Sequence, residues 1–293
     1  YYRAREHSAV LERITGKLVY RLLDISLILS GFVLGFVMIA GAGANLNQEF
    51  GLPTWVGALL CSVLVVVVSM MNFERVTQAI GVFTPIIVGI IVLLAIYTFW
   101  GKSYDWVALD GFAKTLPTAL PNIWVSVVNY YAICIMGAAA MSFVLGGKEM
   151  YVGEAGRGGL IGGAIIGVIT TCTAFILLAN IELASQVAIP MQALVAQIHP
   201  IFGTFMSIII FGMIFNTAIS LYYSLAKRFS GADDVRFKKL MVIFVAVGFG
   251  LSFAGFKTLV ATVFPILGYI GMLMLLVLTT TWIKNRHIIK EER

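Results

Sequence analysis

Long apolar stretches alternate with short polar segments along the whole chain. Eight of these stretches are long enough to cross the roughly 30 Å of bilayer hydrocarbon as helices. They cover residues 24–43, 54–71, 76–99, 122–145, 160–181, 202–225, 237–253 and 259–283. The pattern predicts an all-α polytopic membrane protein in which residues 1–293 form a single transmembrane domain.

Two of the polar connections have helical periodicity of their own. Apolar side chains recur at helical spacing within residues 105–120, at Trp106, Leu109, Phe112 and Leu116. They recur again within residues 186–199, behind Pro190, at Met191, Leu194, Val195 and Ile198. This spacing is typical of amphipathic helices. We expect both segments to be helical and to lie on the external side of the membrane.

Composition and charge agree with a membrane location. Hydrophobic residues make up 60% of the chain, charged residues 12%, and mean hydropathy is +0.97, whereas soluble domains carry roughly 25% charged residues. With the N-terminus inside, all but three of the 20 Lys and Arg fall on cytoplasmic segments; the exceptions are Lys102, Lys114 and Lys257. By the positive-inside rule, the sequence predicts a multi-pass cell (cytoplasmic) membrane protein with both termini of this chain cytoplasmic. The net charge of +6 is therefore explained without a nucleic-acid partner.

The sequence has no recognisable catalytic or metal-binding motif. Cys61, Cys134 and Cys172 lie singly in apolar stretches, and no CxxC, HExxH, nucleophile elbow, P-loop or dinucleotide fingerprint is present. Acidic residues also avoid the apolar stretches, and the deepest, Asp24, follows Arg21 by three positions. We therefore expect that the protein is not an enzyme, and that it holds no resident cofactor and no metal other than a sodium ion.

Two parts of the chain share a pattern. Residues 76–99 contain Val-Phe-Thr-Pro-Ile-Ile around Pro85, and residues 259–283 contain Val-Phe-Pro-Ile-Leu around Pro265. Each is the third helix of a triplet, and the two triplets cross the membrane in opposite senses. Inverted repeats of this kind are common in secondary transporters. Residues 122–145 and 160–181 then lack counterparts, so two further helices are expected upstream of Tyr1, unless the matches are coincidental.

Four short segments of the chain resemble the YkvI-type membrane proteins. They are Ala-Gly-Ala-Gly-Ala at 40–44, Phe-Gly-Leu-Pro at 50–53, Phe-Ala-Gly-Phe at 253–256 and Val-Phe-Pro-Ile-Leu-Gly-Tyr at 263–269. That family resembles the amino acid–polyamine–organocation superfamily of permeases. The resemblance implies a LeuT-like five-plus-five inverted repeat with the first two helices absent here. It also implies a solute site beside a broken sixth helix. Residues 186–199 correspond in position to the external lid of the superfamily. An interfacial helix without a gating role would have the same sequence pattern.

The sixth helix of that fold corresponds to residues 122–145. Its polar and small residues make up the predicted substrate-binding set: Ser126, Asn129, Tyr130, Tyr131 and Gly137. We expect this helix to be interrupted between Tyr130 and Ala140, since a break would free backbone groups to bind a zwitterion or an ion. The alternative is an unbroken helix whose polar groups bond to neighbouring helices.

The eighth helix supplies hydroxyl ligands to a cation in sodium-coupled relatives. Here residues 202–225 contain Asn216, Thr217 and Ser220, and oxygen ligands suit a hard cation. The pattern departs from adjacent hydroxyls, and hydroxyl groups bonded to the preceding helical turn are the alternative. We expect Thr217 and Ser220 to face the broken helix across a polar cavity.

These features favour a secondary transporter that moves an amino acid or similar small solute, coupled to sodium or protons. A transport-fold solute sensor or receptor subunit without net transport is the alternative from another class. A passive channel is disfavoured because the sequence has no ring of charges and no repeated filter. The expected partners are a small-molecule solute and the lipid bilayer, and the sequence gives no indication of oligomeric state.

Overall fold

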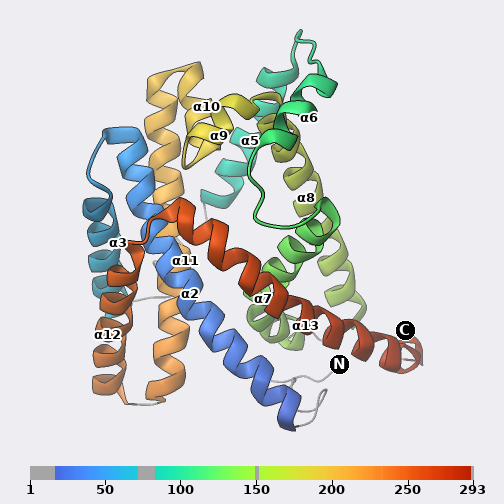
Figure 1. Cartoon of the computed structure of the whole chain (residues 1–293). Coiled ribbons are helices and arrows are strands. Elements are labelled where there is room, and N and C mark those ends of the chain that lie inside the picture. The colour runs from blue at the N-terminus through green and yellow to red at the C-terminus, as the bar shows by residue number, and fades with distance from the viewer. Residues whose placement is uncertain (1–16, 72–82, 149–151, 232, 292–293) are drawn as a thin grey trace. The chain divides into compact units, whose positions relative to one another are not determined.

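The computed structural model describes residues 17–71, 83–148, 152–231 and 233–291, and within these ranges every regular element is a helix (Figure 1). The helices are α2 (Lys17–Phe50), α3 (Thr54–Ser69), α5 (Phe83–Phe99), α6 (Trp106–Thr115), α7 (Ile123–Lys148), α8 (Val152–Ala179), α9 (Ile181–Gln186), α10 (Pro190–Ile198), α11 (Pro200–Ser230), α12 (Asp234–Ser252) and α13 (Phe256–Glu291).

Local sequence signals explain where several helices begin and end. The carboxylate of Asp105 accepts hydrogen bonds from the first amides of α6, and that of Asp233 does the same for α12 at 2.9 Å. Such caps satisfy amides that have no partner within the helix. Gly231 and Gly255 adopt positive φ angles of 60° and 87° in the turns after α11 and α12, where a side chain would be strained.

Four helices in the described part of the chain are long and apolar enough to cross a membrane. They are Leu23–Phe50, Gly156–Ala179, Pro200–Ser230 and Phe256–Thr280. Three other apolar helices are shorter: Thr54–Ser69, Phe83–Phe99 and Ile123–Met136. The chain is therefore an all-helical polytopic membrane protein, with fewer spans established by length and composition than the eight predicted.

The chain divides into two compact units. The first comprises Tyr1–Gly31, Thr118–Ile166 and Ala261–Arg293, of which the described parts belong to α2, α7, α8 and α13. Leu23 and Met274 form a buried apolar cluster in this unit, and Leu27, Ile135, Val277 and Leu278 pack against them. A close approach fixes α7 to α13, because a Cβ on Gly271 would lie 2.5 Å from the Ala132 carbonyl oxygen.

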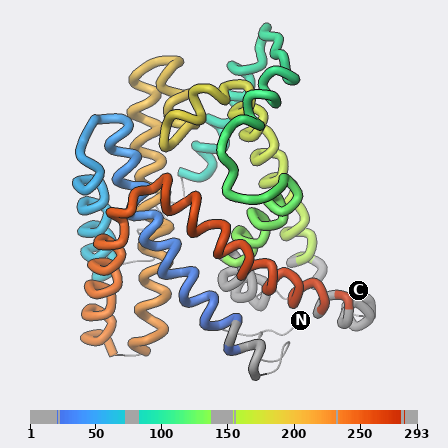
Figure 2. The backbone as a smooth tube through the Cα atoms, viewed as in Figure 1, coloured from blue at the N-terminus to red at the C-terminus, as the bar shows by residue number. Residues whose placement is uncertain are grey.

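The second unit comprises Phe32–Pro117 and Gly167–Val260. Its main core is formed by α2, α3, α11 and α12, and Figure 2 shows α3, α11 and α12 side by side. The core side chains are Ile39, Ala42, Ala58, Cys61, Val65, Phe215, Ala218, Ile219, Tyr222, Ala226, Phe237, Met241 and Val245. Small residues among them let the helix backbones approach closely, as is usual between membrane helices.

A smaller core in the second unit holds the short helices in place. Leu194 and Val195 of α10 pack with Leu94 of α5, Ile176 of α8 and Met206 of α11. Thus α10, which lies within the segment 186–199 predicted to be helical, has its apolar face buried in the protein. Helix α6 lies within the predicted segment 105–120, has no buried residue and contacts α8 through the rings of Trp106 and Phe175.

Candidate functional site

The predicted break in the helix at residues 122–145 is wrong. Helix α7 is continuous from Ile123 to Lys148 and passes through the stretch from Tyr130 to Ala140 without interruption. The reason lies in the residues themselves: three consecutive alanines follow Gly137, alanine has the highest helix propensity, and no proline removes a backbone donor. Gly137 itself lies outside the residues whose surroundings are described.

The other predicted substrate-binding residues of α7 do not converge. Asn129 is 2% exposed and donates from Nδ2 to the Pro265 carbonyl oxygen of α13 at 2.9 Å. The Ser126 hydroxyl donates to the Asn122 carbonyl oxygen one turn back. Tyr130 and Tyr131 are both exposed. Asn129 therefore follows the alternative prediction, in which polar groups bond to neighbouring helices. Its hydrogen bond connects α7 to α13 within the first unit.

The predicted cation-binding residues of α11 show a similar pattern. The Thr217 hydroxyl is exposed and donates to the Met213 carbonyl oxygen at 3.0 Å. The Ser220 carbonyl oxygen accepts from the Ser224 hydroxyl, and Asn216 Oδ1 is buried without a hydrogen-bond partner among the described residues. Bonding to the preceding turn thus accounts for Thr217. Whether α11 faces α7 across a cavity stays a prediction.

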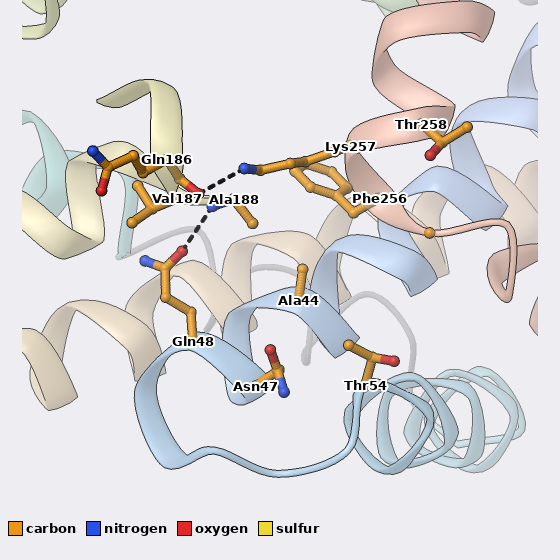
Figure 3. Close-up of a pocket in the computed structure, with 11 residues that line it drawn as sticks. Ala44, Asn47, Gln48, Thr54, Gln186, Val187, Ala188, Phe256, Lys257 and Thr258 are labelled. Carbon is orange, nitrogen blue, oxygen red and sulfur yellow. Dashed lines mark hydrogen bonds between the residues drawn. The ribbon is translucent and has the colours of Figure 1, made fainter. Parts of the chain in front are cut away.

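The structure instead gathers polar side chains at the C-terminal end of α2. Gln48 Oε1 accepts from the backbone amides of Ala188 and Ile189 at 3.1 and 2.9 Å, and its Nε2 donates to the Ile189 carbonyl oxygen at 2.9 Å. One side chain therefore satisfies three backbone groups in the connection between α9 and α10. Figure 3 shows Gln48 reaching across to this connection.

An open pocket lies beside this contact (Figure 3), with a cavity volume of about 430 Å³. The lining comes from the ends of α2, α3, α9 and α13: Ala44, Asn47, Gln48, Thr54, Gln186, Val187, Ala188, Gly255, Phe256, Lys257 and Thr258. Lys257 spans part of its rim, since its Nζ donates to the Gln186 carbonyl oxygen at 2.8 Å. The wall offers amide, hydroxyl and ammonium groups beside an aromatic ring, a set suited to a small polar solute.

A second polar contact lies on the adjoining face of α2. Glu49 Oε1 accepts from the Thr204 hydroxyl at 2.7 Å, and Glu49 Oε2 accepts from Gln192 Nε2 at 3.1 Å. Gln192 is 1% exposed and also contacts Gln48 at 3.5 Å. These bonds attach α10 and α11 to the end of α2.

Sequence reasoning missed this cluster although a signal was present. The predicted helix ended at residue 43, whereas α2 continues to Phe50 through the polar run Asn45-Leu46-Asn47-Gln48-Glu49. Within that run, Asn45, Gln48 and Glu49 lie three and four positions apart and share one helix face. That spacing could have indicated a polar contact surface rather than a loop.

The chain is similar to two proteins of Bacillus subtilis, one of which is described as a membrane protein. It is 24% identical over 243 residues to the uncharacterized membrane protein YkvI of Bacillus subtilis (strain 168), covering 80% of this chain and 66% of that protein. It is 22% identical over 269 residues to the uncharacterized protein YyaD of the same organism, covering 92% of this chain and 77% of that protein. The chain spans about two thirds of the first relative's length, and no protein-family model matches it. Together with its apolar helices, this similarity makes the chain a multi-pass membrane protein related to YkvI and YyaD.

Proposed function

We propose that this chain forms most of the membrane domain of a secondary transporter for an amino acid or a similar small polar solute. Its fold is a LeuT-like five-plus-five inverted repeat, in which eight membrane-crossing helices are present. The observation that carries the proposal is the composition of the main core. Helices α2 and α3, the first two of one triplet, pack with α11 and α12, the first two of the other.

An inverted repeat brings corresponding helices together in this way. The two triplets are related by a half-turn about an axis in the membrane plane, so equivalent helices meet near that axis. Small core residues come from both sides, Ala42 and Ala58 from one triplet and Ala218 and Ala226 from the other. A matched pair of hairpins supports a repeat more strongly than the short sequence matches around Pro85 and Pro265.

The polar pocket supports a solute-handling role. In the proposed orientation, the Gln48 end of α2 is external, and the turn after α11, which follows Lys227 and Arg228, is cytoplasmic. The pocket then opens to the outside, and the connection between α9 and α10, which Gln48 holds, lines one side of it. A sodium or proton gradient supplies the driving force for uptake.

The test is solute flux in proteoliposomes that contain the purified full-length protein. Radiolabelled amino acids are supplied singly, with a sodium gradient, a proton gradient or neither. Accumulation that requires one gradient supports the proposal. Amino acids that raise the thermal unfolding midpoint of the protein without any flux or counterflow would instead identify a solute sensor.

A further inference from the structure

Two buried residues of the second unit that contact each other each carry a side-chain oxygen without a hydrogen-bond partner among the described residues. Asn45 Oδ1 and Ser207 Oγ find none in the described part of the chain, although both side chains are 0% exposed. The two residues touch, since Asn45 Nδ2 donates to the Ser207 carbonyl oxygen at 2.9 Å. Buried polar atoms are nearly always paired in folded proteins. Two such atoms at one helix crossing therefore indicate a partner that the described residues do not supply.

A carboxylate lies one helical turn away. Glu49 follows Asn45 by four positions on α2, and Thr204 precedes Ser207 by three on α11, so each pair shares a helix face. The Thr204 hydroxyl donates its proton to Glu49, which leaves the lone pairs of its own oxygen available. Glu49 is partly buried and forms no ion pair with any described residue. The two facing turns thus carry four oxygen-bearing side chains and one uncompensated negative charge.

We propose that Asn45, Glu49, Thr204 and Ser207 form a binding site for a monovalent hard cation such as Na⁺. Oxygen atoms are the ligands that hard cations select. The single carboxylate matches a single positive charge, whereas divalent Ca²⁺ sites usually gather several carboxylates among six to eight oxygen ligands. A cation also compensates the cost of burying a carboxylate, which a bound water molecule would not.

The site has a polar route to the pocket. Gln48 lines the pocket and contacts Gln192, and Gln192 donates to Glu49. A hydrated ion entering the pocket would therefore meet amide oxygens before it reaches the carboxylate. The site differs from the residues predicted from sequence, which lie further along α11 at Asn216, Thr217 and Ser220. As a coupling site it rests on the proposed function, but its occupancy is measurable without transport.

The test measures thermal unfolding of the full-length protein in detergent, in NaCl or in choline chloride at constant ionic strength. When the sodium concentration is about 100 times the Kd of the site, sodium should raise the unfolding midpoint by roughly 5–10 °C. Ser207→Ala deletes an oxygen that has no hydrogen bond to lose, so the variant should fold normally in choline chloride. Its apparent sodium affinity should fall about tenfold or more, the usual scale for losing one ligand of a charged group.

Ser224→Ala is the matched control, because Ser224 lies on the same helix and its hydroxyl donates to the Ser220 carbonyl oxygen in the preceding turn. It should leave the sodium response unchanged. Glu49→Gln, which keeps the shape of the side chain, should abolish the response and serves if Ser207→Ala does not fold. The proposal is overturned if sodium does not shift the unfolding midpoint of the wild type. It is also overturned if Ser207→Ala and Glu49→Gln both respond to sodium as the wild type does. If Ser207→Ala lowers the unfolding midpoint equally in NaCl and in choline chloride, the partner of these oxygens is a bound water molecule, and the proposal is overturned.

Discussion

Among the residues that the structure describes, Tyr222 is the largest fully buried side chain, and glycines on two neighbouring helices make room for its ring. A Cβ on Gly35 of α2 would lie 2.7 Å from the ring. A Cβ on Gly248 of α12 would lie 2.0 Å from the hydroxyl oxygen and 3.0 Å from Cζ. The hydroxyl has no hydrogen-bond partner among the described residues. At the scale of single residues, the main core is thus arranged around one large ring.

Gly248→Ala should therefore destabilise the protein by about 1–3 kcal/mol, the usual cost of overpacking a core. Tyr222→Phe should be neutral or stabilising, because it removes a buried hydroxyl that is not hydrogen-bonded. In the double variant the cost of Gly248→Ala should shrink, since the closest clash is gone. Unfolding midpoints of the single and double variants form a double-mutant cycle. Gly250→Ala is the control, as a Cβ there meets nothing within 4 Å, and strictly additive effects would contradict the packing argument.

At the scale of elements, Gln48 should control the order of the connection between α9 and α10. Gln48→Ala removes three hydrogen bonds to the backbone of Ala188 and Ile189, so these two amides should exchange with solvent faster. Hydrogen exchange followed by mass spectrometry measures the change. Asn47→Ala, which removes only a bond to the Leu52 carbonyl oxygen, should leave residues 187–190 unaffected. Equal exchange in both variants would show that the buried apolar face of α10 and the bond from Gln192 to Glu49 hold this helix without Gln48.

Periodicity predicted the position of α10 but not what holds it. The spacing of Met191, Leu194 and Val195 indicates a helix, and α10 begins at Pro190. Its tether, Gln48, lies 140 residues earlier in the chain than Ala188, and no local pattern links the two. The predicted break in α7 failed for a related reason. It came from the resemblance to a fold, whereas the local sequence of small residues favours a continuous helix.

At the scale of the whole molecule, the orientation in the membrane stays a prediction with a direct test. Cys61, Cys134 and Cys172 are first replaced by alanine, and single cysteines are then introduced at exposed positions. Ser103→Cys should react with a membrane-impermeant maleimide added to intact cells. Val235→Cys, in the first turn of α12 and next to several basic residues, should react only after permeabilisation. The reverse pattern would invert the topology, because the asymmetry of Lys and Arg that predicts it would then be misleading.

Helix α3 has a consequence for the surrounding lipid. Its 16 residues span only about 24 Å at 1.5 Å per residue, which is less than the roughly 30 Å hydrocarbon thickness of a typical bilayer. The side chains that it turns away from the core are apolar and exposed: Leu59, Leu60, Val63 and Val67. In the proposed arrangement α3 crosses the membrane, so acyl chains next to it would have to compress to match it, at a cost that grows with hydrophobic mismatch. In nanodiscs of graded acyl-chain length, the protein should unfold at the highest temperature in the shorter-chain lipids.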